Sequence, residues 1–317
     1  MSHDGTQTVP TSAPPTAPPL ANGFTWRAAI IGGLLVVFVC IWSQYAELVI
    51  HGTQISLTYP PIGAFLVFGA LIVLFQWPLY ALRRQLALTT AELVIIWSML
   101  SLAIGVASID FAQKMPPMIA GVFYYASDQN HYQDRFVPHV APWLAPTDPE
   151  VIRGMYEGSA AGVPWKAWLG PLAGWSAFFV LAYWVMLCGV ALFQRQWVDH
   201  ERLLFPLVVV PLQIMDQPAP GRVLNRFLRN PLVWIGVFLG ATPHLYTGLH
   251  DYFSKVPQAD IFLWGKRISE GTLAKPWTPF NGLLIAILPL IIGLSFLLTR
   301  EISFSLWFFY LLGKLEA

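Results

Sequence analysis

Long apolar segments separated by short polar loops recur along the chain from residue 28 to its last residues. The segment Ala28–Ile50, for example, contains a single acidic residue, Glu47. A helix rises about 1.5 Å per residue and the hydrocarbon core of a bilayer is about 30 Å thick, so about 20 apolar residues cross it. We therefore predict an all-α, polytopic transmembrane helix bundle of about seven spans. The predicted spans cover residues 28–50, 61–82, 89–111, 171–193, 232–249 and 283–299, with a seventh that begins near residue 302.

One apolar segment, Leu203–Met215, is too short to cross a membrane and contains Pro206 and Pro211. Proline removes a backbone donor and clashes with the preceding turn, and the freed carbonyls are tolerated at membrane depth only where protein or water covers them. The pattern predicts a short, Pro-broken re-entrant segment, and such segments are typical of transporter sites. An interfacial segment on the cytoplasmic face is the alternative.

The chain divides into a tail and a membrane domain. Residues 1–24 are polar and rich in proline, which predicts a disordered, extended tail. Residues 25–317 form the predicted transmembrane domain. The tail lacks a basic segment followed by an apolar core, so we do not expect it to be a cleavable signal.

The distribution of basic residues predicts the orientation. Arg83 and Arg84 lie in a very short loop, and cytoplasmic loops are enriched in Lys and Arg. This places the N-terminus and loop 194–230 in the cytoplasm, and loops 112–170 and 250–282 outside. The dense basic cluster Arg222–Arg229 then lies inside as well, where it could touch anionic lipid.

The composition supports lipid as the surroundings and as the first partner. The chain is 56% hydrophobic and only 11% charged, whereas soluble domains are about 25% charged. The net charge of +1 gives no basic excess for nucleic acid. No cofactor or metal site is predicted, because Asp128, His131 and Asp134 lack a second His or Cys, and the two cysteines suit apolar packing.

Polar residues within spans are the candidate chemistry, since an ionisable group at the centre of a span costs about 2.5–3.5 kcal/mol. Gln44, Glu47 and His51 are spaced i, i+3 and i+7, which predicts one shared helix face. They could form the polar wall of an outward-facing cavity, with Glu47 holding a proton or cation and His51 titrating near neutral pH. A solvated helix end is the alternative.

Two further residues are candidates for a substrate or ion pathway. Asp110 ends the third predicted span and could carry the coupling ion, although a local ion pair with Lys114 is the simpler interpretation. His244 follows Pro243 in the fifth span, near glycines, and we expect it to be a buried polar group beside a freed carbonyl. A His that is hydrogen-bonded only to a neighbour is the alternative.

Two segments of the chain share a pattern. Pro164-Trp165-x-x-Trp168-x-Gly170-x-Leu172 matches Pro276-Trp277-x-x-Phe280-x-Gly282-x-Leu284, and each precedes a predicted span. Each provides a proline at the start and an interfacial indole. Repeats are common in transporters, but the shared physics of a membrane interface would also produce this match.

The segment 196–207 (QWVDHERLLFPL) contains Trp197, Glu201, Phe205 and Pro206. With residues 164–172 and 302–310, it resembles a large bacterial family of uncharacterised multi-pass membrane proteins. Its W-V-x-x-E-[RK]-L-x-F-P-L pattern is similar to one in oligopeptide transporters. The resemblance covers residues 25–317 and implies the N-terminal half of a transporter fold in the bacterial inner membrane, with a peptide-like or metal-chelate substrate. It carries no functional residues over.

In physical terms, Asp199 or Glu201 could cap the short helix that follows, and Trp197 would mark the interface. Our leading hypothesis is a solute transporter, or half of one, that works by alternating access with a coupling ion on Glu47 or Asp110. A second half-chain or another copy would complete it. A membrane scaffold and an enzyme acting on a lipid-linked substrate are the alternatives. A polar cavity joining Gln44, Glu47 and His244 would favour transport.

Overall fold

The computed structural model describes residues 24–52, 54–56, 61–108, 111–202, 205–253, 255–257, 266–268, 271, 273–285 and 289–316. Most of these residues are helical, which confirms the predicted all-α fold. The predicted tail, up to residue 23, lies outside the described residues. Four helices are long and apolar enough to span a membrane. They are Trp26–Val49, Ile62–Leu82, Trp165–His200 and Pro231–Tyr252.

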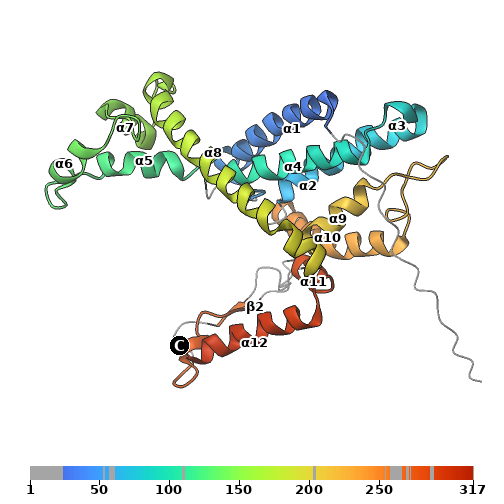
Figure 1. The fold of residues 1–317 in the computed structure, drawn as a ribbon. Helices are drawn as coiled ribbons and strands as arrows, with labels where there is room; N and C mark the ends of the chain where they lie inside the picture. The colour runs from blue at the N-terminus through green and yellow to red at the C-terminus, as the bar shows by residue number, and fades with distance from the viewer. Residues whose placement is uncertain are drawn as a thin grey trace, which may run out of the picture.

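The first part of the chain forms a helix bundle (Figure 1). Its elements are α1 (Trp26–Gln44), η1 (Tyr45–Val49), α2 (Ile62–Leu71), η2 (Ile72–Gln76), α3 (Trp77–Leu82), η3 (Arg84–Leu86) and α4 (Thr90–Val106). The turns η1 and η2 are π-helical and continue α1 and α2 without a break. The third predicted span is thus a 17-residue helix, α4.

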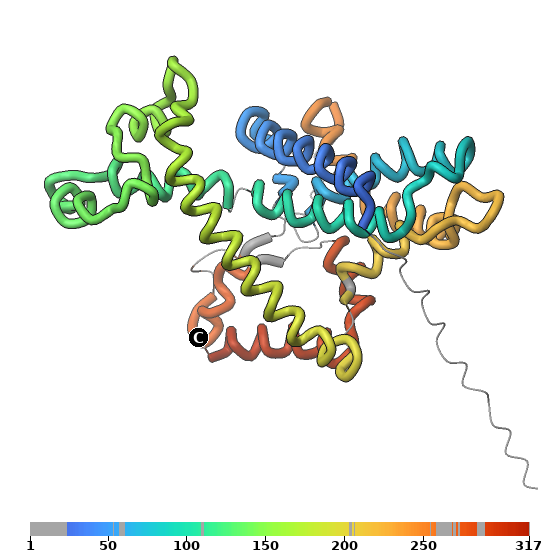
Figure 2. The backbone as a smooth tube through the Cα atoms, turned by 45° about the horizontal axis from the view of Figure 1, so that its top comes forward, coloured from blue at the N-terminus to red at the C-terminus, as the bar shows by residue number. Residues whose placement is uncertain are grey.

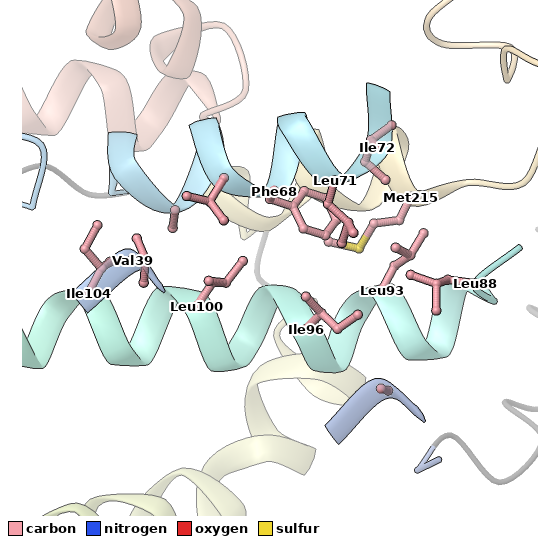
Figure 3. Close-up of a cluster of buried hydrophobic side chains, with 13 residues drawn as sticks. Val39, Phe68, Leu71, Ile72, Leu88, Leu93, Ile96, Leu100, Ile104 and Met215 are labelled. Carbon is pink, nitrogen blue, oxygen red and sulfur yellow. The ribbon is translucent and has the colours of Figure 1, made fainter. Parts of the chain in front are cut away.

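The hydrophobic core lies between α1, α2 and α4. Figure 3 shows Phe68 and Leu71 of α2 facing Ile96 and Leu100 of α4, with Met215 inserted at one end. All five side chains are nearly or fully buried. α1 approaches α4 closely at Gly32, where an added Cβ would lie 2.6 Å from Met99 Sδ. Small residues permit such approaches in membrane bundles.

A separate helical lobe follows α4, on the left of Figure 1. Its elements are α5 (Met115–Tyr124), α6 (Tyr132–Arg135), η4 (Val137–His139) and α7 (Pro149–Glu157). Ala120, Ile152 and Trp168 form its small core. Tyr156 Oη donates a hydrogen bond to Pro117 O, and burial raises the pKa of this phenol. The predicted loop 112–170 is therefore a packed unit.

The longest helix, α8 (Trp165–Arg195), continues as the π-helical turn η5 (Gln196–His200). It runs obliquely from the α5–α7 lobe across the molecule (Figures 1 and 2). The next helices are α9 (Pro206–Met215) and α10 (Pro231–Tyr252). The segment predicted as Pro-broken is thus a ten-residue helix whose last residue, Met215, packs into the core of the first bundle.

The sixth predicted span, 283–299, differs from the prediction. The structure has β1 (Lys266–Arg267) paired with β2 (Leu284–Ile285), with η6 (Thr278–Phe280) between the two strands. α11 (Pro289–Ser295) and α12 (Arg300–Glu316) follow. Asn281 accepts from Leu273 N and donates to Leu273 O, and Gly282 has a φ of 76°, so the chain turns back here. The second copy of the Pro-Trp pattern therefore lies between β1 and β2, whereas the first copy forms the start of α8.

Candidate functional site

The most deeply placed carboxylate among the candidates is Glu47, which lies in η1 at the end of the first spanning helix. It is only 8% exposed. Its Oε1 accepts hydrogen bonds from the Ser56 backbone N at 3.0 Å and from Ser56 Oγ at 2.7 Å. Its Oε2 accepts from Gln113 Nε2 at 2.8 Å. A single carboxylate therefore joins the end of α1 to two other segments, and all three of these donors are neutral.

Gln44 lies one turn before Glu47 and also points toward α4. Its Nε2 donates to the backbone carbonyl of Ala107, which caps the end of α4. Gln44 also lines an open hollow of about 660 Å³ between α1 and α4. Most of the other residues that line this hollow are apolar, among them Val36, Leu102 and Val106. Gln44 therefore adjoins a large apolar hollow at the surface of the bundle.

The structure brings together only part of the predicted polar face. His51 lies beyond the end of η1, is exposed and has a left-handed backbone with a φ of 54°. The π-helical turn adds a residue between Gln44 and His51, so the i, i+7 relation of a regular α-helix does not hold. Asp110 lies outside the described residues.

His244 is not the buried group that the sequence predicted. It lies within α10 but on an exposed part of that helix. The hydrogen bonds of Gln44 and Glu47 in the described chain reach Ala107, Ser56 and Gln113 instead. The expectation failed because neighbouring apolar residues on one helix do not determine which of its faces is covered by the rest of the chain.

The sequence did not predict the two partners of Glu47. Ser56 is buried, at 3% exposed, in the short connection between α1 and α2. Gln113 lies 66 positions from Glu47, just after the third predicted span. A polar amide directly after an apolar segment was the only signal, and it carries no information on which helix the amide contacts.

The described residues of the W-V-x-x-E-[RK]-L-x-F-P-L pattern make local contacts. Trp197 stacks on Phe193 with ring centroids 5.5 Å apart. Glu201 accepts from Gln196 Nε2 at 3.0 Å, so the expected cap on the next helix is wrong. Phe205 is the residue that precedes α9, which begins at Pro206 and has no side-chain cap. A five-residue gap separates η5 from α9, and this distance explains why neither acid reaches the helix start.

A second polar cluster holds the other end of the bundle together. Glu92 forms a capping box with Thr89. Its carboxylate also accepts from Arg27 Nε at 3.1 Å, from Arg27 Nη2 at 2.5 Å and from Thr25 Oγ1 at 2.6 Å. This cluster, which we call the Arg27–Glu92 clamp, fixes the start of α1 to the start of α4.

Within the described ranges, no group of three or more His, Cys, Asp or Glu side chains is arranged to hold a metal ion. The groups around Glu47 are the Ser56 backbone N–H, the Ser56 hydroxyl and the Gln113 amide, and all three donate to its carboxylate.

Long apolar helices around one packed bundle, together with a buried carboxylate in a spanning helix, define a polytopic α-helical membrane protein. The chain belongs to the Family of unknown function (DUF6785), which it matches over residues 18–317. This match confirms the recognition of an uncharacterised family from the sequence. No curated protein and no solved structure matches the chain.

Proposed function

We propose that this chain is a secondary transporter of a small solute, or the part of one that carries the coupling site, and that Glu47 holds the coupling proton or cation. One observation carries the proposal. Glu47 is buried in a membrane-spanning helix and is held by three neutral donors from two other segments. Acids inside spans are costly, and they occur mainly in ion pathways and proton relays.

The partners of Glu47 suit a group that changes its charge. When the carboxylate is ionised, both of its oxygens accept hydrogen bonds. When it is protonated, one oxygen becomes a donor and needs an acceptor. The Gln113 amide can turn to present its oxygen, and the Ser56 hydroxyl can rotate, because each group is both a donor and an acceptor. The Ser56 backbone N–H cannot reverse its role, so protonation changes the contact between α1 and the connection that holds Ser56.

This rearrangement gives a coupling mechanism. The segments that carry Ser56 and Gln113 are held to the end of α1 through one carboxylate. Neutralising Glu47 weakens these charge-assisted bonds, which are roughly twice as strong as neutral ones. The two segments are then free to move relative to α1, which is the kind of local change that alternating access requires. The substrate class that we propose, a peptide or a metal chelate, is supported by the similarity of residues 197–207 to the oligopeptide-transporter pattern.

The helices α8 and α10 of the proposed transporter are left uncovered by the rest of the described chain. No residue in the most apolar stretch of α8 or of α10 is buried. Lipid covers part of such a surface in a bilayer, and we propose that a second half-chain or a second copy covers the rest. The expected path for the solute then lies between these helices and the α1–α4 bundle.

Proteoliposome uptake tests the proposal. The full chain is reconstituted with a pH-sensitive dye inside, and an inward proton or sodium gradient is imposed with either Ala-Ala dipeptide or iron(III) citrate as the solute. We expect gradient-driven uptake by the wild-type chain and at least a tenfold loss in Glu47→Gln. Glu150→Gln, which removes an exposed acid on α7, is the matched control and should transport normally.

Two results would contradict the proposal. Wild-type uptake by Glu47→Gln would remove the coupling role of this residue. If the correctly folded wild-type chain moved neither solute under either gradient, the proposed substrate classes would be wrong. Circular dichroism of each variant separates these outcomes from a loss of fold.

A further inference from the structure

The connection between α9 and α10, residues 216–230, is built around one buried asparagine. Asn225 is 3% exposed. Its Nδ2 donates to the carbonyls of Gln213, Ile214 and Asp216 at 2.8, 3.1 and 2.9 Å, and its Oδ1 accepts from Leu228 N at 2.9 Å. Both ends of the amide are therefore satisfied within the segment and the end of α9. We call residues 216–230 the arginine lobe, because this segment contains Arg222, Arg226 and Arg229.

The arginine lobe is also fixed to the helix bundle. Arg84, between α3 and α4, donates to Ala219 O at 3.0 Å and to Pro218 O. Thr90 Oγ1 at the start of α4 donates to Met215 O at 3.3 Å. Because Met215 is itself part of the bundle core, the lobe has a defined position relative to the spanning helices.

The lobe presents three exposed arginines, Arg222, Arg226 and Arg229, against one acid, Asp216. Arg222 and Arg229 line an open hollow of about 340 Å³, and the other two lining residues are Val223 and Leu224. In the part of the chain that the structure describes, the ion pair formed is Arg27–Glu92, so these guanidinium groups are not neutralised by a carboxylate there. The hollow therefore combines two available positive charges with an apolar floor.

The lobe lies at the start of a spanning helix. Asn230 caps α10, which begins at Pro231, and Trp234 in its first turn donates Nε1–H to Leu228 O at 2.7 Å. Trp234 is 46% exposed, and exposed indoles favour the headgroup layer of a bilayer. With Trp234 in the headgroup layer, the hollow would lie near the lipid phosphates, beside the start of α10.

We propose that the arginine lobe binds the headgroup of an anionic phospholipid. The guanidinium groups of Arg222 and Arg229 would hold the phosphate through charge-assisted hydrogen bonds, for which their forked geometry is suited. Val223 and Leu224 would contact the glycerol and the first methylenes of the acyl chains. The apolar floor and the position beside α10 favour a bilayer lipid over free phosphate, which would gain nothing from either.

Lipid titration of the purified full chain, followed by native mass spectrometry, tests this inference. The probes are phosphatidylglycerol, phosphatidylcholine with the same acyl chains, and inorganic phosphate. Each basic residue near a lipid surface contributes about 1 kcal/mol, which is about fivefold in affinity. We therefore expect Arg222→Gln/Arg229→Gln to lose roughly 30-fold in affinity for phosphatidylglycerol.

The matched control is Arg135→Gln/Arg153→Gln, which removes two exposed charges from the α5–α7 lobe. This variant should bind phosphatidylglycerol like the wild-type chain. Equal binding of the two lipids, equal loss in both double variants, or competition by millimolar inorganic phosphate would each overturn the inference. The lipid titration does not depend on transport, so its failure is distinct from a failure of the proposed function.

Discussion

The Arg27–Glu92 clamp gives a prediction whose size follows from its burial. Glu92 is 3% exposed and the Arg27 side chain is 41% exposed. Removing one partner of a fully buried ion pair costs about 3–5 kcal/mol, whereas exposed pairs contribute about 0–1 kcal/mol. In Glu92→Gln, the arginine that remains can turn toward water, so we expect a loss of about 2 kcal/mol in the free energy of unfolding.

The reverse substitution should cost more. Arg27→Gln leaves a buried carboxylate with only its Thr25 and Thr89 donors, and it also removes the hydrogen bonds from Arg27 to Leu86 O and Ala87 O. We expect a loss of about 3–4 kcal/mol for this variant. In the double variant, both charges are gone, so the two losses should not add, and the coupling energy should be about 1–2 kcal/mol.

The measurement is equilibrium unfolding in mixed micelles by titration with a denaturing detergent, followed by far-UV circular dichroism. Glu150→Gln serves as the control for loss of an exposed acid and should change the unfolding free energy by less than about 0.5 kcal/mol. If Arg27→Gln were less destabilising than Glu92→Gln, the carboxylate would not be the more buried partner. If the losses were additive, the two residues would not form a clamp at all.

Two further predictions concern packing at other positions. Gly63→Ala should destabilise the bundle by about 1–3 kcal/mol in the same unfolding titration, because the added Cβ would lie 2.4 Å from Ile104 Cδ1. Gly69→Ala should be neutral or stabilising, because its added Cβ would have nothing within 4 Å. A loss in Gly69→Ala as large as that in Gly63→Ala would contradict this packing. Tyr156→Phe should cost about 0.5–1.5 kcal/mol by removing the bond to Pro117 O, seen as faster hydrogen exchange in α5 with unchanged exchange in α4. Unchanged exchange in α5 would show that this bond does not hold the lobe.

Hydropathy was sufficient to predict the long helices, because a spanning helix satisfies its own backbone and needs no information about its neighbours. It failed at residues 283–299, where the composition is as apolar as elsewhere. There, Asn281 holds the backbone of Leu273 and Gly282 adopts a positive φ, so a hairpin forms before Pro289 starts a short helix. The turn residues between the two segments determine the structure here, and mean hydropathy does not detect such residues.

The candidate site was predictable only as far as one helix determines it. Gln44 and Glu47 lie one turn apart, but they bond different groups: Gln44 bonds Ala107 O, and Glu47 bonds Ser56 and Gln113. Ser56 and Gln113 come from other segments, and their pairing with Glu47 depends on how α1, α2 and α4 pack. The periodicity of one segment does not indicate which other segments it contacts. For the same reason, the exposure of His244 could not be predicted.

The π-helical turns explain both the successes and the errors at the site. Glu47 lies in η1 and Gln76 lies in η2, and both are buried polar side chains, 8% and 1% exposed. Gln76 bonds both the N and the O of Leu88, just as Glu47 bonds segments outside its own helix. Since each residue of an α-helix turns by about 100°, the residue that a π turn adds rotates everything after it by about that angle. The π turn η1 therefore rotates His51 away from the position that a regular helix would give it relative to Gln44, and Glu47 makes its hydrogen bonds to Ser56 and Gln113 without His51.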